Sequence, residues 1–219
     1  MIDAVVFDLD GVLLDSEQLW DEVREELARE RGGQWSDRAQ AEMMGMSSPE
    51  WSRYMHEVVG LPESPDEISE EVVRRMEARY RERLPLIPGA REAIERLAAR
   101  WPLGLASSSN RPLIDLALEL SGLAPLFAVT VSSEEVGRGK PAPDVYLEAV
   151  RRLGVDPANG AAVEDSGNGI RSAHAAGLRV IAIPNSHFPP DADVLALADV
   201  TLDSLADLTP GVIDPDYSE

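Results

Sequence analysis

The sequence contains no cysteine and is poor in positive charge. Without cysteine, its 219 residues cannot form a disulfide, a zinc–thiolate site or a thiol nucleophile. Its 20 Lys and Arg residues against 40 Asp and Glu residues give a net charge of −20 at pH 7. Because nucleic acids and anionic membrane surfaces attract basic proteins, we expect neither as a partner. If the substrate is itself an anion, positive charge at its site must overcome this acidic background.

Long hydrophobic runs are also absent from the sequence. No apolar stretch approaches the roughly 18 residues that a membrane-spanning helix needs. The first residues, Met1-Ile2-Asp3, are acidic where a signal peptide would be basic. With 44% hydrophobic residues the chain can still bury a proper core. We therefore expect a soluble cytoplasmic protein.

Two kinds of pattern divide the chain. A short apolar strand is predicted at residues 3–7, and residues 16–84 then show helical patterns only. In the first of these helices Leu19, Val23 and Leu27 recur every four residues. After residue 88, helices alternate with strand candidates at residues 103–106, 127–131, 160–163, 179–183 and 199–202.

This alternation of strands and helices determines the predicted fold class. It is typical of a parallel sheet covered by helices on both faces. The strand at residues 3–7 must join that sheet, because a single apolar strand cannot be buried alone. We therefore predict an α/β fold, with a Rossmann-like parallel-sheet core of residues 1–14 and 86–219. Residues 15–85 are predicted to form an inserted α-helical cap domain.

Polar residues follow the predicted strands where those strands end. In an open parallel sheet, chemistry gathers beyond the carboxyl ends of the strands. Carboxylates, a hydroxyl and a lysine converge there from four separate segments: Asp8, Asp10, Ser107, Lys140, Glu164 and Asp165. Alone, the pair of Asp8 and Asp10 also fits an ordinary strand-end turn, but four polar strand ends together argue against that interpretation.

The spacing of the carboxylates predicts a cation among them. Asp8 and Asp10 lie two residues apart, so they start on one side of an extended chain, roughly 6.6 Å apart, before Gly11 lets the backbone turn away. With Glu164 and Asp165 they place up to four carboxylates in one pocket, where mutual repulsion raises pKa values unless a cation intervenes. Oxygen ligands without His or Cys favour Mg²⁺ over zinc.

The other polar groups complete the pattern of a phosphoryl-transfer site. Lys140, together with the hydroxyl of Ser107, remains available to hold an anion. A metal ion, a cation and a hydroxyl around a spare carboxylate are the parts that phosphoryl transfer uses.

Four segments carry a resemblance to a known family: "DLDGVLLDS", "LASSSN", "GRGKPAPDVY" and "VEDSGNGI". In this order they resemble the motifs of the haloacid dehalogenase superfamily, and the insertion is placed and sized like its helical cap. The similarity covers essentially the whole chain, and the sugar-phosphate phosphatases and β-phosphoglucomutases are the most similar group. The metal-free dehalogenases of the superfamily lack a carboxylate at the position of Asp10, so dehalogenation is not expected.

The resemblance implies a role for each site residue. Asp8 would be the nucleophile that becomes an aspartyl-phosphate, and Asp10 the general acid to the leaving oxygen and then the base for water. Mg²⁺ would be held by Asp8, the carbonyl of Asp10 and Asp165, with Glu164 less firmly assigned to it. Ser107 and Lys140 would hold the transferring phosphoryl group.

Three functions agree with these residues. The first is a Mg²⁺-dependent phosphatase for a small phosphorylated metabolite, a sugar or polyol phosphate, and we expect it to be a monomer. The second is a sugar-phosphate mutase of the β-phosphoglucomutase type, but Trp20 and Ser48 stand where the mutase pattern has histidine and arginine. The third is a phospho-aspartate signalling or binding domain, which has no need of about seventy helical residues over its site. We therefore predict the phosphatase.

Several other residues receive an ordinary structural interpretation. His56, His174 and His187 are expected to be structural, and Ser109 and Asn110 to cap a helix. A further four residues either line a pocket between cap and core or pack inside the cap: Trp20, Met43, Met44 and Met46.

Overall fold

A parallel sheet of six strands forms the centre of the protein. The structure is a computed structural model, and it describes residues 1–36, 38–43, 46–185 and 187–217. The strands are β1 (Ala4–Phe7), β2 (Leu103–Ser107), β3 (Phe127–Ser132), β4 (Gly160–Glu164), β5 (Arg179–Ala182) and β6 (Val200–Thr201). They lie in the order β3-β2-β1-β4-β5-β6. The first strand of the chain is thus central, between β2 and β4.

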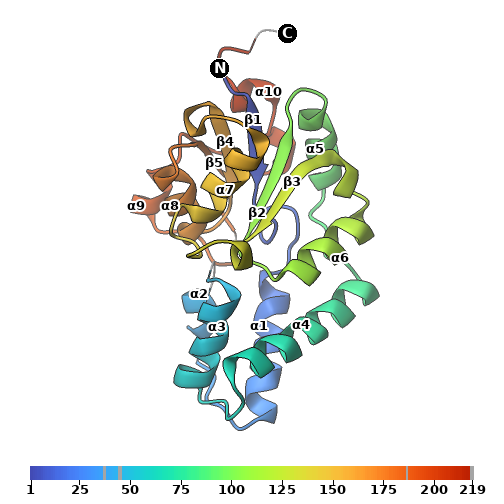
Figure 1. The fold of residues 1–219 in the computed structure, drawn as a ribbon, viewed down its shortest axis with the longest axis vertical. Helices are drawn as coiled ribbons and strands as arrows, with labels where there is room; N and C mark the ends of the chain where they lie inside the picture. The colour runs from blue at the N-terminus through green and yellow to red at the C-terminus, as the bar shows by residue number, and fades with distance from the viewer. Residues whose placement is uncertain (37, 44–45, 186, 218–219) are drawn as a thin grey trace.

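Helices cover both faces of this sheet (Figure 1). The core helices are α5 (Ala90–Ala98), α6 (Arg111–Ser121), α7 (Asp144–Leu153), α8 (Gly167–Ala175), α9 (Ala192–Leu195) and α10 (Pro210–Ile213). Successive residues of β1 point to opposite faces: Val5 and Phe7 join the cluster that includes α5 and α6, while Val6 joins that of α7 and α8. Every residue of β1 is buried, as a strand covered on both faces requires.

The described residues between β1 and α5 form helices and loops without a strand, and they make a separate layer (Figure 1). Its helices are α1 (Glu17–Glu30), α2 (Ala39–Met43), α3 (Ser48–Tyr54) and α4 (Pro65–Glu82), with a π-helical turn at Met55–Val59. Leu14 and Leu86 pair in an antiparallel bridge where the chain leaves and re-enters the core. We call residues 15–85 the helical insertion.

The predicted fold class, a parallel α/β core with a helical insertion, is confirmed. The division at residues 14/15 and 85/86 stays a prediction. The last predicted strand shortens to Val200–Thr201, and the short helix α2 was not predicted. Within the described residues, every helix is too short or too polar to cross a membrane.

Candidate active site

Asp8 and Lys140 form a buried ion pair at the carboxyl end of β1. The Lys140 ammonium lies 2.8 Å from Oδ1 of Asp8 and 2.6 Å from Oε1 of Glu164, so it lies between the ends of β1 and β4. Burial raises the pKa of Asp8 to about 8; Lys140 opposes that rise, and the carboxylates of Glu164 and Asp10 add to it. Burial alone lowers the pKa of Lys140, but its two carboxylate neighbours outweigh it and hold that pKa above its usual value.

Glu164 is fully buried, and both of its carboxylate oxygens already accept hydrogen bonds. Oε1 accepts from Lys140 and, at 2.8 Å, from the Tyr146 hydroxyl on α7. Oε2 accepts from the backbone N–H groups of Asp165, at 3.0 Å, and Ser166, at 3.3 Å. Glu164 therefore holds Lys140 in place and fixes the turn that follows β4.

The Asp165 side chain differs from that of Glu164 in its hydrogen bonding. It is fully buried, yet neither carboxylate oxygen has a hydrogen-bond partner. Burial, with the adjacent Glu164 carboxylate, raises the pKa of Asp165 well above its usual value. Gly11 permits this approach, since its φ is +80° and a Cβ there would lie 1.8 Å from Oδ2 of Asp165. A buried carboxylate without a donor is costly unless a cation compensates it.

The acidic cluster fits a hard divalent cation. One oxygen from each of Asp8, Glu164 and Asp165 lies within 4.8 Å of the others. All three groups are oxygen donors, the type of ligand that Mg²⁺ prefers. Because both oxygens of Glu164 accept other hydrogen bonds and those of Asp165 accept none, Asp165 fits direct metal contact better than Glu164 does.

Asp10 links the core to the helical insertion. Its Oδ1 accepts from the hydroxyl of Ser16 at 2.5 Å, the indole N–H of Trp20 at 3.2 Å and the hydroxyl of Tyr80 at 3.4 Å. Its Oδ2 accepts from the hydroxyl of Ser109 at 2.6 Å. Three donors come from the insertion and one from the core, so the orientation of this carboxylate depends on how the two parts meet.

The serine loop after β2 brings two hydroxyl residues to the site. Ser107 is fully buried, and its hydroxyl accepts from the backbone N–H of Ser109 at 3.0 Å. It is the next two residues, Ser108 and Ser109, that line the cavity. Asn110 occupies the N-cap position of α6, but its side chain donates to Glu134 at 2.9 Å instead of capping the helix. The prediction of a helix cap is thus right in position for Asn110, although its side chain makes no capping hydrogen bond, and wrong for Ser109, whose hydroxyl donates to Asp10.

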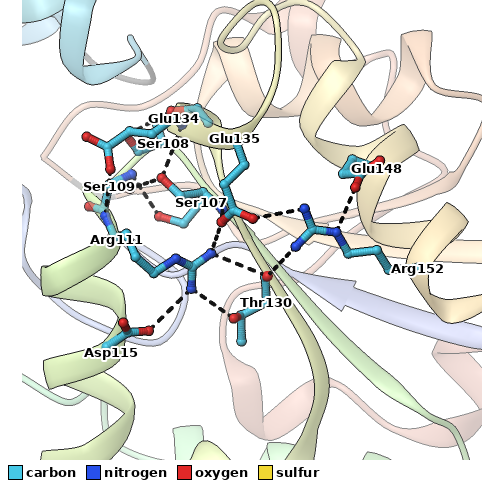
Figure 2. A network of polar contacts seen from close by, with 12 residues as sticks. Ser107, Ser108, Ser109, Arg111, Asp115, Thr130, Glu134, Glu135, Glu148 and Arg152 are labelled. Carbon is cyan, nitrogen blue, oxygen red and sulfur yellow. Dashed lines mark hydrogen bonds and ion pairs between the residues drawn. The ribbon is translucent and has the colours of Figure 1, made fainter.

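A polar network lies next to β3, beside this loop (Figure 2). Arg111 pairs with Glu135 and donates to the Thr130 hydroxyl at 2.9 Å. Arg152 pairs with the same Glu135 at 2.8 Å and with Glu148 at 2.7 Å. Figure 2 shows Ser107, Ser108 and Ser109 beside these ion pairs. The loop itself is attached at the end of β3, where the hydroxyls of Ser132 and Ser133 donate to the carbonyl groups of Ser109 at 2.7 Å and Ser108 at 3.2 Å.

A cavity lies between the core and the helical insertion. Its core side is lined by Asp8, Asp10, Ser108, Ser109, Lys140 and Asp165. Its other side is lined by Glu17, Trp20, Arg24, Met43, Met46 and Trp51. Trp20, Met43 and Met46 thus line a pocket, one of the two alternatives that the sequence left open, and Met44 lies outside the described residues. Among the residues described, no histidine belongs to this lining.

Comparison with known proteins agrees with this geometry. A sequence model of the haloacid dehalogenase-like hydrolases matches residues 2–177, most of the chain. The chain belongs to this family. The family expected from the four motifs is therefore confirmed, and the chain is a hydrolase.

Two curated members of the family and one solved structure show the range of relatives. Hexitol phosphatase B of Escherichia coli K12 is 36% identical over 212 residues, 94% of each chain. The bifunctional riboflavin kinase/FMN phosphatase of Arabidopsis thaliana is 33% identical over 207 residues, which are 94% of this chain but 54% of that protein. This chain thus spans about half the length of that relative. A CbbY variant of Rhodobacter sphaeroides, in complex with xylulose-(1,5)bisphosphate, has a TM-score of 0.84 and 29% identity, covering 98% of this chain and 100% of that one.

Within the haloacid dehalogenase-like hydrolases, the expected class of phosphoric monoester hydrolase agrees with the names of these relatives.

The structure adds residues that sequence reasoning missed. Tyr80 contacts Asp10 from α4, and Glu17 and Arg24 line the cavity from α1. Glu17 precedes Trp20 by three residues and Arg24 follows it by four, a helical spacing that places all three side chains on one face of α1. That spacing was the signal available in the sequence.

Proposed function

We propose that this protein is a Mg²⁺-dependent phosphatase that hydrolyses a sugar or polyol phosphate through an aspartyl-phosphate on Asp8. One observation carries the proposal: Asp8, Lys140 and Asp165 meet at one edge of a parallel sheet, beneath a helical insertion that contacts Asp10. A nucleophile, a cation, a donor-free carboxylate and an acid are thereby brought together from separate segments.

The first half of the proposed reaction uses Asp8 and Asp10. A carboxylate oxygen of Asp8 bonds to phosphorus while the ester P–O bond breaks, and Asp10 gives its proton to the departing oxygen. In the second half Asp10 takes a proton from water, whose oxygen bonds to phosphorus and frees Asp8 and inorganic phosphate. Splitting the reaction in this way replaces one difficult step by two easier ones.

The metal ion and Lys140 are proposed to neutralise negative charge in the site. Mg²⁺ held by Asp8, Asp165 and the carbonyl of Asp10 would neutralise the negative charge that phosphate and carboxylates bring together. Lys140, with a pKa above its usual value, stays charged at neutral pH and is proposed to bind the phosphoryl oxygens with Ser107. The excess of lining carboxylates makes such neutralisation necessary before an anionic substrate can bind.

The helical insertion supports an enzyme over a phospho-aspartate signalling or binding domain. Ser16, Trp20 and Tyr80 all donate to Asp10, so the insertion bears directly on the proposed acid–base group. A segment that covers the site can also control water access and substrate choice. We propose that it acts as a cap over the substrate. The expectations of a monomer and of a cytoplasmic location stay predictions.

The choice between phosphatase and mutase rests on two residues of the insertion. Trp20 offers Asp10 a neutral indole N–H, and Ser48 is buried with only 3% of its surface exposed. Neither supplies the positive charge expected at these positions of a mutase. Water, rather than a second sugar hydroxyl, is therefore proposed to accept the phosphoryl group.

A substrate panel with two readouts tests the proposal. Hexose, deoxyhexose and polyol phosphates are incubated with Mg²⁺, and both inorganic phosphate and isomerised sugar phosphate are measured. We expect phosphate release, with little conversion of β-glucose 1-phosphate to glucose 6-phosphate even when a bisphosphate primer is present. Efficient isomerisation with little phosphate release would establish the mutase, and no product from any metabolite would favour the signalling or binding domain.

A further inference from the structure

Two charged residues line the insertion side of the cavity, and the proposed chemical steps use neither. Glu17 and Arg24 lie seven residues apart on α1, two helical turns, so they project from the same face as Trp20. Glu17 is 8% exposed and Arg24 is 5% exposed. Both line the same cavity as Asp8. Charged side chains are seldom buried to this extent, and these two form part of the wall of the cavity.

The guanidinium of Arg24 is held by two indole rings. Its Cζ lies 4.5 Å from the centroid of the Trp20 ring and 4.8 Å from that of Trp51, within the range of a cation–π interaction. The two rings lie 6.0 Å apart at an angle of 60° and restrict the guanidinium. Because the indole N–H of Trp20 donates to Asp10, this arrangement is tied to the proposed acid. Arg24 is thus a restricted cation in the cavity wall, beside the indole ring that contacts Asp10.

The charges around Arg24 indicate what it can bind. Burial lowers the pKa of Arg24 to about 10, while the carboxylates of Glu17, Asp10 and Asp21 oppose that shift. The guanidinium therefore stays charged at neutral pH, and three carboxylates act on it electrostatically. A second phosphate group would meet net negative charge here. Neutral hydroxyls meet N–H donors on Arg24 and a carboxylate acceptor on Glu17, without a charge penalty.

We propose that Arg24 and Glu17 form the subsite for the leaving group of the substrate, with Arg24 donating to its hydroxyl oxygens and Glu17 accepting from its hydroxyl groups. The pair selects phosphomonoesters of neutral polyhydroxy compounds and disfavours bisphosphates. This inference rests on the proposed phosphatase function and names the part of the cavity that determines its substrate.

The test compares two substrates that differ in their leaving groups. Sorbitol 6-phosphate presents hydroxyls to the subsite, whereas acetyl phosphate has no hydroxyl on its leaving group. For Arg24→Met, the ratio of kcat/KM for sorbitol 6-phosphate to that for acetyl phosphate should fall ~10- to 100-fold, as loss of a charge-assisted hydrogen bond implies. Arg24→Lys keeps the charge but not the planar fork, so the ratio should fall less. The matched control is Arg29→Gln on the same helix, where Arg29 is 72% exposed and the ratio should stay within about twofold.

A second comparison tests Glu17. Glu17→Gln removes one of the three carboxylates around Arg24, so the preference for sorbitol 6-phosphate over fructose 1,6-bisphosphate should weaken about tenfold, on the order of a close charge pair. An Arg24→Met variant that loses activity equally on sorbitol 6-phosphate and acetyl phosphate would overturn the subsite. So would selective loss of activity on the bisphosphate, which would make Arg24 a second-phosphate site.

Two further observations keep these outcomes separate. Thermal unfolding is recorded for each variant, and if Arg24→Met does not fold, an unchanged substrate ratio in Arg24→Lys refutes the subsite. Wild-type protein that releases no phosphate from any substrate would refute the proposed phosphatase itself. Wild-type phosphatase activity with an unchanged ratio in the Arg24 variants would refute this inference alone.

Discussion

Replacing Lys140 by methionine should destabilise the protein strongly, because the buried Glu164 carboxylate would lose its cation and the Asp8 carboxyl group its polar partner. Only 1% of the Lys140 side chain is exposed, against 9% for Asp8 and 0% for Glu164. Breaking a buried ion pair from one side costs about 3–5 kcal/mol. For a domain of this size each kcal/mol lowers Tm by about 2–4 °C, so Lys140→Met should lower Tm by about 6–20 °C.

The assay is thermal unfolding at pH 7 without divalent cations, checked by urea denaturation. Arg138→Met is the matched control, because Arg138 lies in the same loop and pairs with Asp144 but is 72% exposed. A surface ion pair contributes about 0–1 kcal/mol, so this control should stay within a few degrees of wild type. If Lys140→Met is no less stable than the control, the buried ion pair does not hold the site together, and the reasoning is wrong.

Three further predictions concern the same site. In metal-free protein, stability should fall as pH rises from about 4 to about 8, because Asp8 has a pKa of about 8 when folded and 3.8 when unfolded; equal urea midpoints at pH 5 and pH 8 would contradict this. Mg²⁺ at a hundred times its Kd should stabilise the protein by about 2.7 kcal/mol, and Asp165→Asn should lose most of that gain; an undiminished thermal shift in the variant would exclude Asp165 as a ligand. Trp20→Phe removes a donor to Asp10 and should lower kcat up to about tenfold, as loss of a hydrogen bond to a charged group implies. If kcat of the control Trp51→Phe falls equally, the indole N–H of Trp20 has no specific role.

The core of the fold and the placement of the acidic cluster were predictable from local pattern. A run such as Ala4–Phe7 has to be buried on both faces, and in a parallel sheet all strand ends meet at one edge. Asp8 and Asp165 therefore meet because β1 and β4 are neighbours. Lys140 could be predicted as a site residue because a single lysine stands among the polar loop residues. Its contact with both Asp8 and Glu164 could be seen only in the three-dimensional structure.

The hydrogen bonds around Asp10 and Glu164 were not predictable, because their partners come from distant helices. Tyr80 reaches Asp10 only because α4 packs over the site, and Tyr146 reaches Glu164 only because α7 packs across the neighbouring strand β1. Arg24 was missed for a different reason. A charged residue on an amphipathic helix is usually solvated, and only the packing of α1 against α3 buries this one against Trp51.

The most direct test of the account is phosphate release by the Asp8→Asn variant. The amide has the shape of the carboxyl group, so the variant should fold, which thermal unfolding verifies. Because the proposed aspartyl-phosphate cannot form on an amide, kcat for the best hexose or polyol phosphate in the presence of Mg²⁺ should fall on the order of 10³-fold or more. A folded Asp8→Asn variant that releases phosphate within tenfold of the wild-type rate would contradict nucleophilic catalysis by Asp8.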